Sequence, residues 1–418
     1  MATSGRHRYD VAVVGGGPSG AACAYWLAEA GHDVVVVEKK HFPREKTCGD
    51  GLTPRAVKQL DDMGLESALA DHHRFDGLRS IAFGQTLELP WPEVPGLPRH
   101  GYVITRHDLD ELVAERAAKA GATLRQGCEA VAPTLDGGFV TGLTVAEKEN
   151  GRSTTDIEAR YVVVADGANS RFGRALGTQR DRAYPQGMAI RGYFASPRHD
   201  EPWIESHLDI RDRSGNVLPG YGWIFPLGDG RVNVGIGLLS TFSQWKAVNT
   251  SHLMDAFVDH APKSWGISPE TSCGAPTGGR LPMGFSVGPR VGPTWLVVGD
   301  AAGAINPFNG EGIAYAYETG RLAADVVHQA LVDDDGLVLQ EYDRRLDAEY
   351  ALYYRVARAF VHIIGNPPLM RALVQTGMHS RTLMEWVLRI MANLLRPDEL
   401  GPAELAYKAV AQLAKLAA

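Results

Sequence analysis

The sequence has few cysteines and lacks any apolar run long enough to cross a bilayer. Its 418 residues include four cysteines, none of them in a Cys-x-x-Cys pair: Cys23, Cys48, Cys128 and Cys273. This spacing argues against a zinc site or a disulfide framework and fits a reducing cytosol. No stretch approaches the ~20 apolar residues of a membrane span, and no apolar leader segment follows Met1. We therefore expect a cytoplasmic protein with no metal site, signal peptide or transmembrane helix.

The chain also lacks an excess of positive charge. Its formal net charge is −7 at pH 7, so the composition gives no support to nucleic-acid binding. The hydrophobic share of 44% and the charged share of 22% are ordinary for a globular protein. The length allows two domains, and we find no repeats and no low-complexity tract.

What the sequence does have is a glycine motif near its N-terminus. The apolar run 11–14 predicts a buried strand, and Gly15-x-Gly17-Pro18-Ser19-Gly20 follows it at the start of a helix. These glycines allow a tight turn and close approach of a pyrophosphate, which the helix N-terminus would face. Glu38 ends the next strand, where its carboxylate can accept a hydrogen bond from a ribose hydroxyl. The alternative is a glycine-rich turn without a ligand. We predict a dinucleotide site formed by Gly15, Gly17, Pro18, Ser19, Gly20 and Glu38.

A second glycine motif lies far along the chain. A buried strand ends at Gly299-Asp300, and Asn306-Pro307 and Gly310-Glu311-Gly312 then lead into a helix over 313–330. Asp300 would face a ribityl or pyrophosphate group, and the helix start at Gly310, Gly312 and Ile313 suits the anionic edge of a reduced flavin. Ordinary loop flexibility is the alternative for the two glycines. Both motifs together, in this order, indicate FAD.

Two weaker signals lie between these motifs. Asp166-Gly167 ends a strand and resembles a turn that supports the pyrophosphate in flavin monooxygenase-type folds, although Asp-Gly is a common turn. Arg106 opens a helix and resembles an arginine that reaches the FAD phosphates in those enzymes; the alternative is a solvated surface arginine. Gly235-x-Gly237 matches a second dinucleotide motif only in part. We therefore expect no NAD(P)H domain, and a transient electron donor, either NAD(P)H or a redox protein.

The pattern along the chain predicts a discontinuous organisation. We expect a helix over 106–120, strands over 123–131, 139–148 and 157–164, an antiparallel sheet within 187–239, and a return to the first domain through the strand 295–298. The predicted FAD-binding domain comprises 1–75, 103–178 and 280–330, and the substrate domain 76–102 and 179–279. Residues 331–418 form a C-terminal helical region, broken at Asn366-Pro367-Pro368 and at Arg396-Pro397.

Further segments resemble the geranylgeranyl reductase family. They are Phe42-Pro43-Arg44-x-Lys46-x-Cys48-Gly49-Asp50-Gly51-Leu52, Pro219-x-Tyr221-x-Trp223-x-Phe225-Pro226, and the second glycine motif. The resemblance runs from about residue 9 to 330, and the Cys48 segment is most similar to the actinobacterial branch that reduces menaquinone. It implies an α/β Rossmann-type FAD domain like that of p-hydroxybenzoate hydroxylase, with an antiparallel β substrate domain. It also places Lys39, Cys48, Gly49, Asp50, Gly51 and Ala130 at the cofactor.

The same resemblance implies the chemistry, namely FAD-dependent reduction of an isolated double bond in a polyprenyl lipid, most simply one isoprene unit of menaquinone. Tyr221, Trp223 and Phe225 alternate, so on a strand they share one face and can wall an apolar cavity; the alternative is plain sheet core. Cys48 is a candidate residue beside the flavin ring, or else a small buried hydrophobe. The predicted catalytic set is Cys48, Tyr221, Trp223 and Phe225, and the sequence identifies no proton donor.

Other functions remain open at this stage. One alternative is reduction of geranylgeranyl diphosphate or of a geranylgeranylated lipid, and another is a non-catalytic flavin-binding module. An aromatic hydroxylase or halogenase is more distant, because a halogenase of this fold is expected to show Trp-x-Trp-x-Ile-Pro where this chain has Tyr221-x-Trp223-x-Phe225-Pro226. The amphipathic stretch 383–395 predicts a core helix, a membrane-surface helix or a lid on a prenyl channel. Because a prenyl chain is insoluble, we expect peripheral association with the cell membrane.

Overall fold

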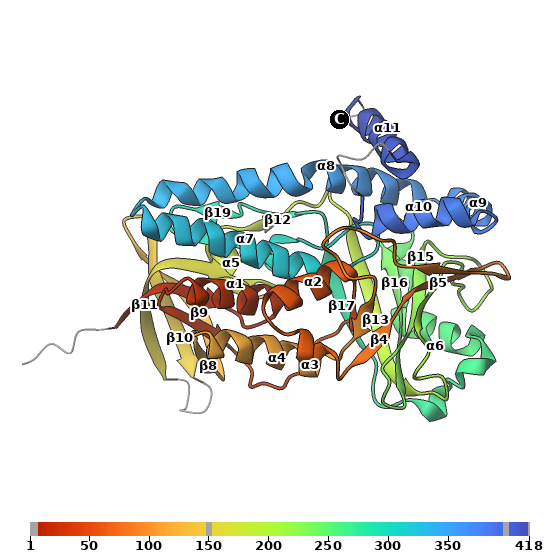
Figure 1. The fold of residues 1–418 in the computed structure, drawn as a ribbon, viewed down its shortest axis with the longest axis horizontal. Coiled ribbons are helices and arrows are strands. Elements are labelled where there is room, and N and C mark those ends of the chain that lie inside the picture. Colours follow the sequence, from red (N-terminus) through yellow and green to blue (C-terminus); the bar gives the residue numbers. More distant parts are fainter. Residues whose placement is uncertain (1–6, 148–152, 396–400, 417–418) are drawn as a thin grey trace, which may run out of the picture.

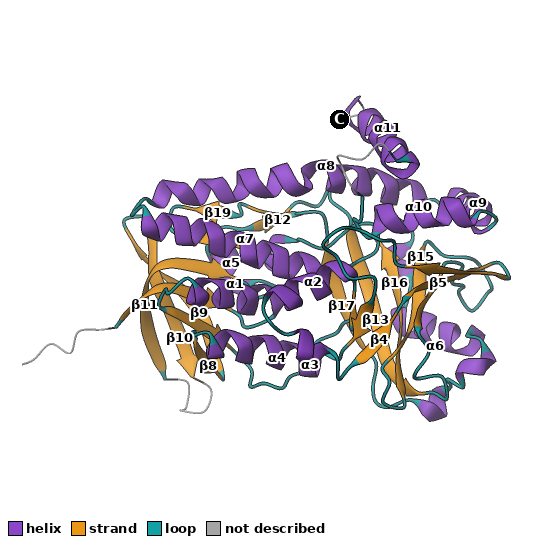
Figure 2. Cartoon of the chain, viewed as in Figure 1, coloured by secondary structure: helices purple, strands orange, loops and turns teal. Residues whose placement is uncertain are grey.

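The computed structural model describes residues 7–147, 153–395 and 401–416 (Figure 1). Two large sheets lie side by side along the long axis, and the helices α7 (Ile313–Val332) and α8 (Glu341–Ile364) run along one side of the molecule (Figures 1 and 2). Lys148 and the predicted break at Arg396-Pro397 lie outside the described residues.

The first sheet carries the two glycine motifs. It has eight strands in the order β19-β20-β11-β1-β2-β8, and the β9–β10 hairpin extends from β11. Its strands are β1 (Arg8–Val14), β2 (Val34–Glu38), β8 (Thr123–Gln126), β9 (Cys128–Asp136), β10 (Phe139–Glu147), β11 (Thr154–Val164), β19 (Val291–Gly292) and β20 (Trp295–Val297). The pairs that join β8, β2, β1, β11 and β20 are all parallel. The predicted strand–helix–strand unit at the N-terminus and the predicted return through residue 295 are confirmed.

Both faces of this sheet are covered, which explains the unbroken valine runs in β1 and β2. Val11, Val13, Val34 and Val36 pack with α1 (Pro18–Glu29), α4 (Arg106–Lys119) and α7 in one apolar cluster. Ala12, Val14, Val35 and Val37 pack on the other face with residues of β10. The helices α1 and α7 approach closely, because a Cβ on Gly320 would lie 2.3 Å from the Ser19 carbonyl oxygen. The two glycine motifs are therefore held together by their own helices.

One sequence-based expectation for this sheet is wrong. We expected a single strand over 123–131, and the structure breaks it at Gly127 into β8, which pairs with β2, and β9, which pairs with β10. Gly127 has φ +70°, and a Cβ there would lie 2.5 Å from the His41 ring. The glycine lets the chain leave the parallel sheet and begin the hairpin.

The second sheet has seven strands in the order β17-β13-β16-β15-β14-β5-β6. They are β5 (Gly77–Ala82), β6 (Gln85–Pro90), β13 (Gln186–Ala195), β14 (Trp203–His207), β15 (Gly220–Pro226), β16 (Arg231–Leu239) and β17 (Thr277–Pro282). The expected antiparallel pairing holds except between β14 and β5, which are parallel because the chain enters them from distant segments. The helix α6 (Thr250–His260) covers the face opposite the aromatic residues of β15, where a Cβ on Gly222 would lie 2.4 Å from Phe257.

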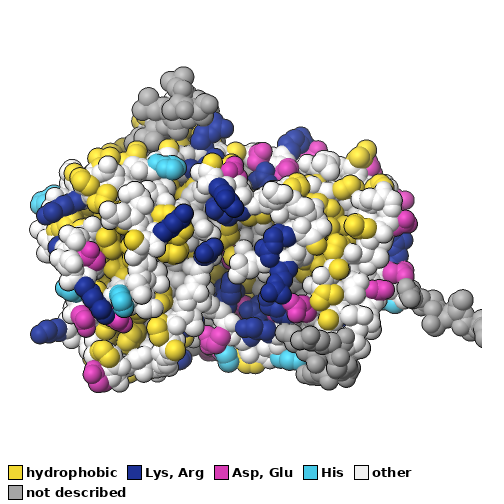
Figure 3. Space-filling model, turned by 180° about the vertical axis from the view of Figure 1, so that it is seen from behind, with side chains coloured by type: hydrophobic (Ala, Val, Ile, Leu, Met, Phe, Trp, Pro, Cys, Tyr) yellow, Lys and Arg dark blue, Asp and Glu magenta, His cyan; other side chains and the backbone are white. Residues whose placement is uncertain are grey.

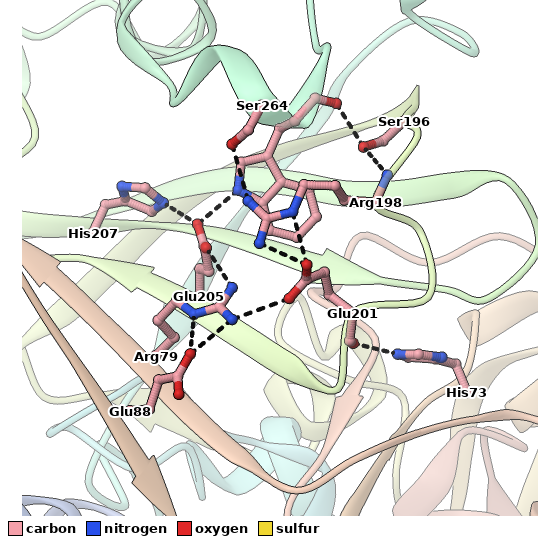
Figure 4. Close-up of polar contacts among 10 residues, drawn as sticks. His73, Arg79, Glu88, Ser196, Arg198, Glu201, Glu205, His207 and Ser264 are labelled. Atoms are coloured by element: carbon pink, nitrogen blue, oxygen red, sulfur yellow. Dashed lines mark hydrogen bonds and ion pairs between the residues drawn. The ribbon is translucent and has the colours of Figure 1, made fainter.

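A buried ion-pair cluster fastens the parallel pair (Figure 4). Arg79 of β5 contacts Glu88 at 2.9 Å, Glu201 at 3.0 Å and Glu205 at 3.1 Å. Glu205 also accepts a hydrogen bond from the Trp265 indole at 2.9 Å. Removing Arg79 would leave the buried Glu205 carboxylate with only His207 at 3.0 Å and the Trp265 indole as partners, so we assign this cluster a structural role.

Short elements connect the sheets. They are α2 (Pro54–Asp62), α3 (Glu66–Leu69), α5 (Arg171–Ala175), the strands β3 (Gly51–Leu52), β4 (His73–Phe75), β7 (Gly101–Val103), β12 (Gln179–Arg180) and β18 (Val287–Gly288), and the 3₁₀ turns η1 (Trp245–Ala247), η2 (Lys263–Trp265), η3 (Pro269–Thr271), η4 (Gly299–Ala302) and η5 (Gly336–Gln340). β3, β7 and β4 form a small sheet.

The C-terminal region is helical, as expected. After α8 come α9 (Pro367–Met378), α10 (Arg381–Met391) and α11 (Pro402–Leu416). Asn366 caps α9 by accepting the Leu369 N–H at 3.3 Å, so the predicted break at Asn366 is confirmed. Met384 and Leu388 of α10 pack in one apolar cluster with Phe75 of β4 and Leu89 of β6. In the part of the chain that the structure describes, no helix is long and apolar enough to cross a membrane.

Candidate active site

The first glycine motif forms an open helix end at the edge of the parallel sheet. Gly15 has φ +102°, and a Cβ there would lie 2.5 Å from the Ala165 carbonyl oxygen. Gly17 is the N-cap of α1 and supplies no side-chain cap, so the first N–H groups of the helix, at Ser19 and Gly20, are left to bind a ligand. Around Gly17, a Cβ would meet only the Arg44 guanidinium, at 3.5 Å.

The Glu38 carboxylate lies beside the glycine turn and is hydrogen-bonded to its backbone. Its Oε2 accepts the Gly16 N–H at 3.0 Å, and its Oε1 accepts the Lys40 N–H at 3.0 Å. The carboxylate is buried, whereas the side chain of the neighbouring Lys39 is exposed. Backbone N–H groups thus orient Glu38 at the end of β2, where the sequence predicts the ribose contact.

The second glycine motif meets the first at the same place. Gly299 has φ +58°, and a Cβ there would lie 2.5 Å from the Ser19 hydroxyl. Asp300 Oδ2 lies 3.4 Å from Lys46 Nζ. Gly312 is the N-cap of α7, which starts at Ile313, and a Cβ on Gly312 would lie 3.4 Å from Asp300 Oδ1. Predicted site residues that are almost three hundred positions apart are therefore in contact.

Sequence reasoning missed the arginine at this site. Arg44 lies beside Gly17, contacts Glu38 at 3.4 Å and Asp110 at 3.0 Å, and its Nε is buried without a hydrogen-bond partner among the described residues. Arg106, the arginine that we predicted, binds the same Asp110 through two hydrogen bonds of 2.6 and 2.8 Å, and its contact with the FAD phosphates stays a prediction. The Phe42-Pro43-Arg44 segment was the available signal for Arg44.

Asp166 and Ala130 lie at the periphery of this arrangement. The Asp166 backbone lies against Gly15, and its Oδ2 accepts the N–H groups of Arg171 at 2.9 Å and Phe172 at 3.1 Å, which caps α5. Ala130 lies in β9 and pairs with Val145 of β10. Their contacts with the cofactor stay predictions.

Three aromatic side chains of β15 form a continuous wall, which confirms that they share a face. The ring of Trp223 lies 5.8 Å from that of Tyr221 and 6.2 Å from that of Phe225. Gly49 and Gly51 lie on this wall, because a Cβ on either would be within 3.2 Å of the Phe225 ring. The Cys48–Gly51 loop and the predicted catalytic aromatics are thus brought together.

A buried hydrogen-bond network fixes the indole of Trp223. Its Nε1 donates to Asn233 Oδ1 at 2.9 Å, and Asn233 Nδ2 donates to Asp50 Oδ2 at 2.7 Å and to the Cys48 carbonyl at 2.9 Å. Tyr193 completes it by donating to Asp50 Oδ2 at 2.6 Å. Sequence reasoning did not identify Asn233 or Tyr193, because these contacts span long sequence separations.

The partial Gly235-x-Gly237 motif has a packing role here. A Cβ on Gly235 would lie 2.2 Å from the Trp223 ring, so β16 provides a flat surface for the indole. A residue larger than glycine would push Trp223 away from the Cys48–Gly51 loop.

Burial raises the pKa of both titratable groups in the Cys48–Gly51 loop, Cys48 and Asp50. It raises the pKa of Asp50 to about 6, against the lowering effects of the Tyr193 hydrogen bond and the Arg191 charge. It also raises the pKa of the Cys48 thiol, so this cysteine is a neutral thiol at neutral pH. Cys48 therefore has the properties of a proton-bearing or packing group and lacks those of a nucleophile.

The chain is similar to an FAD-binding family and to menaquinone reductases over most of its length. Residues 8–206 match the family described as FAD binding domain. Menaquinone reductase of Mycolicibacterium smegmatis is 42% identical over 392 residues, which is 94% of this chain and 93% of that protein. Menaquinone reductase of Mycobacterium tuberculosis strain H37Rv is 40% identical, over 97% of this chain and 96% of that protein. The chain belongs to the geranylgeranyl reductase family. It is an FAD-dependent oxidoreductase.

A more distant relative supports this assignment, and solved structures share the fold. Digeranylgeranylglycerophospholipid reductase 1 of Methanopyrus kandleri is 31% identical to this reductase, over 85% of the chain and 90% of that protein. A geranylgeranyl bacteriochlorophyll reductase-like structure from Thermoplasma acidophilum has a TM-score of 0.79 at 23% identity and covers 97% of this chain and 100% of its own. A flavin-dependent brominase has a TM-score of 0.75 at 18% identity, over 99% of this chain and 100% of its own. These two structures show the shared fold alone.

The residues present in the reductase fit FAD. The open end of α1, the space beside Gly17 and the unpartnered Arg44 Nε suit a pyrophosphate, and Glu38 suits a ribose. When bound, FAD supplies the hydride for the reduction. The start of α7 at Gly312 and Ile313 would favour negative charge on the reduced ring. A search of the described ranges finds no group of three or more His, Cys, Asp or Glu side chains that could hold a metal ion.

Proposed function

We propose that this reductase saturates one isoprene unit of menaquinone. The observation that carries the proposal is the wall of Tyr221, Trp223 and Phe225 packed against the Cys48–Gly51 loop. A prenyl chain has no polar handles, so burial and shape must position its double bond. The identity of 40–42% with proteins named menaquinone reductase favours this substrate over geranylgeranyl diphosphate.

In this proposal the protein positions the double bond, excludes water from it and supplies a proton to it. The aromatic wall holds one isoprene unit flat, and the hydrogen bond from Trp223 to Asn233 keeps the wall in place. The apolar side chains of the wall would keep water away from the double bond that they hold. An isolated alkene also needs a proton on its second carbon, and a residue of this chain must hold it.

The electron donor that we propose is NAD(P)H or a redox protein. Figure 3 shows Lys and Arg side chains gathered across the middle of the face opposite to the view of Figure 1. Such a band attracts an anionic partner even though the whole chain carries a net charge of −7. Within the proposed division, the FAD-binding domain comprises 1–75, 103–178 and 280–330, and the sheet of β15 belongs to the substrate domain except for the end of β17, which crosses the boundary at residue 280.

A turnover assay tests the proposed function. The purified protein with FAD, a reduced donor and menaquinone in detergent should convert menaquinone to a product heavier by one hydrogen molecule, measured by mass spectrometry. Geranylgeranyl diphosphate, assayed in parallel, should stay unreduced. Faster reduction of the diphosphate than of menaquinone would contradict the proposal and favour the alternative substrate.

We further propose that α9 and α10 bring the protein to the membrane surface. Leu369 and Leu373 of α9 have exposed fractions of 44% and 45%, and Ile363 and Leu383 on the adjoining helices are also exposed. The expected amphipathic helix is α10. One of its faces packs on the sheet of β15 through Met384 and Leu388, and Leu383 leaves an apolar side chain exposed to solvent. An exposed apolar group of this kind suits the headgroup boundary.

Replacing both Leu369 and Leu373 by Asp should abolish co-sedimentation with menaquinone-containing vesicles. Two charges in the contact face oppose insertion, and binding by the unchanged protein should persist at high salt because the contact is apolar. Flavin absorbance should be unchanged, since both side chains lie on the surface. Leu337→Asp, on η5 with an exposed fraction of 77%, is the matched control and should bind normally. Equal loss in both variants, or release by salt, would contradict the assignment.

A further inference from the structure

Glu311 has one buried carboxyl oxygen for which the described part of the chain supplies no hydrogen bond. It lies between Gly310 and Gly312 in the second glycine motif. Its Oε1 accepts a hydrogen bond from the Thr53 hydroxyl, whereas its Oε2 is buried and has no hydrogen-bond partner among the described residues. A buried carboxylate oxygen without a donor is costly, and a proton on that oxygen removes the charge.

Asp50, the other buried carboxyl group at the site, has the opposite surroundings. Its Oδ2 accepts hydrogen bonds from Tyr193 and Asn233, and its Oδ1 accepts the Arg106 N–H at 3.3 Å. Three donors stabilise the ionised form of Asp50 and leave no acceptor for a proton of its own. Burial raises the pKa of both carboxyl groups, to about 6 for Asp50 and to about 7 for Glu311, so Glu311 keeps its proton to higher pH, whereas Asp50 anchors the aromatic wall.

Glu311 lies where the flavin-binding loop touches the aromatic wall. The Tyr221 hydroxyl donates to the Asn309 carbonyl at 2.5 Å, and a Cβ on Gly310 would lie 3.7 Å from the same hydroxyl. Glu311 therefore directly follows Asn309 and Gly310, the two residues that contact the Tyr221 hydroxyl of the aromatic wall. The titratable groups that face it from the surrounding elements are Arg55 of α2, Tyr221 of β15, Glu318 and Tyr315 of α7, and Tyr353 of α8.

We propose that Glu311 holds the proton that completes alkene reduction. This inference rests on the proposed function. One alkene carbon receives the hydride, which brings both electrons, and the second carbon forms its C–H bond with the proton that leaves the Glu311 carboxyl. Glu311 is then a carboxylate, and it regains one proton from solvent before the next turnover. One hydride and one proton are consumed for each double bond, and no further oxidant or reductant is needed.

The environment of Glu311 is consistent with an acid that works near neutral pH. Burial raises its pKa to about 7; the Thr53 hydrogen bond, the Arg55 charge and the nearby Asn309 side chain lower the pKa, and Glu318 raises it. An acid must be protonated to act, so the rate should be highest below this pKa and fall by about tenfold for each pH unit above it. Arg55 is itself paired with Glu318 at 2.7 Å, so it lowers the Glu311 pKa less than a free arginine would.

Glu311→Gln tests the assignment because it keeps the size of the side chain and removes its proton. We expect kcat to fall by about 10²–10⁴-fold, which is the usual contribution of a general acid. FAD content and the rate at which the donor reduces the flavin should be unchanged, and the decline in rate above neutral pH should disappear. Wild-type activity in Glu311→Gln, or an unchanged pH profile, would overturn the proposal.

Thr53→Val gives a second test that does not remove the acid. Loss of the Thr53 hydrogen bond should raise the pKa of Glu311, because that bond stabilises the carboxylate. The falling limb of the pH–rate profile should therefore move to higher pH, with little change in the rate at low pH. A limb that stays in place, or one that moves to lower pH, would overturn the proposal.

Infrared spectroscopy separates failure of this inference from failure of the proposed function. The wild-type holoenzyme should show the carbonyl band of a protonated carboxylic acid that disappears on titration through about pH 7, and Glu311→Gln should lack this band and keep any band of Asp50, whose pKa is about 6. If the band is present and menaquinone is not reduced, the substrate assignment is wrong and the acid stands. If menaquinone is reduced and the band is absent, the acid assignment is wrong.

Discussion

Gly17→Leu should yield a folded protein that is purified colourless. Gly17 has φ −73° and ψ −176°, an extended conformation that any residue adopts, and a Cβ there would touch only Arg44, at 3.5 Å. The leucine side chain would instead occupy the space in which a pyrophosphate approaches the end of α1. We expect at least a hundredfold loss of FAD affinity, about 2.7 kcal/mol, measured by flavin absorbance and by titration of the apoprotein.

Gly20→Val is the informative contrast. A Cβ at Gly20 would lie 1.9 Å from the Gly15 carbonyl oxygen, so this substitution must distort the turn itself. It should lower the melting temperature of the apoprotein, whereas Gly17→Leu should leave that temperature near the wild-type value. Full flavin occupancy in Gly17→Leu would show that the first glycine motif does not contact the pyrophosphate.

Trp223→Ala should nearly abolish menaquinone reduction while FAD stays bound. The indole contacts the Cys48–Gly51 loop, lies over Gly235 and donates to Asn233, so its loss removes the centre of the wall. We expect kcat/KM to fall by about 10²-fold or more, and the apoprotein to lose about 3–5 kcal/mol of stability because a buried indole is deleted.

Trp223→Phe is the matched control. It retains an aromatic ring in the wall and loses the hydrogen bond to Asn233, so it should keep part of the activity. Mass spectrometry of the quinone gives the activity, and the flavin spectrum gives the cofactor content. If Trp223→Ala loses its flavin while the remaining holoenzyme turns over normally, the wall is structural and does not bind the substrate.

Local patterns were sufficient to predict the parts of the site that a short segment defines. The glycines at 15, 17 and 20 follow a strand and start a helix, and each of those relations is visible within a few residues. The alternation of Tyr221, Trp223 and Phe225 likewise fixed their common face before any tertiary contact was known.

Contacts between distant segments could not be predicted in this way. The residues 39–50 form no regular helix or strand, so no periodicity marks which face of Arg44 or Asp50 is buried. Asn233 lies 183 positions from Asp50 and looks like an ordinary strand residue, yet it connects the Cys48–Gly51 loop to the wall. The break at Gly127 was also missed, because the residues on both sides favour strands and only the position of His41 requires the glycine.

The order of the strands in the first sheet has a consequence for biosynthesis. The strand β20 pairs with β11, and all of β13–β17 lies between them in the chain. During synthesis from the N-terminus, the first glycine motif therefore emerges long before Gly299 and α7, which complete the cofactor site. Until then, the side of α1 that packs against α7 has no partner from this helix. If the second glycine motif holds FAD as the sequence predicts, the cofactor site is complete only when the last third of the chain has been made, so flavin capture would belong to the end of folding.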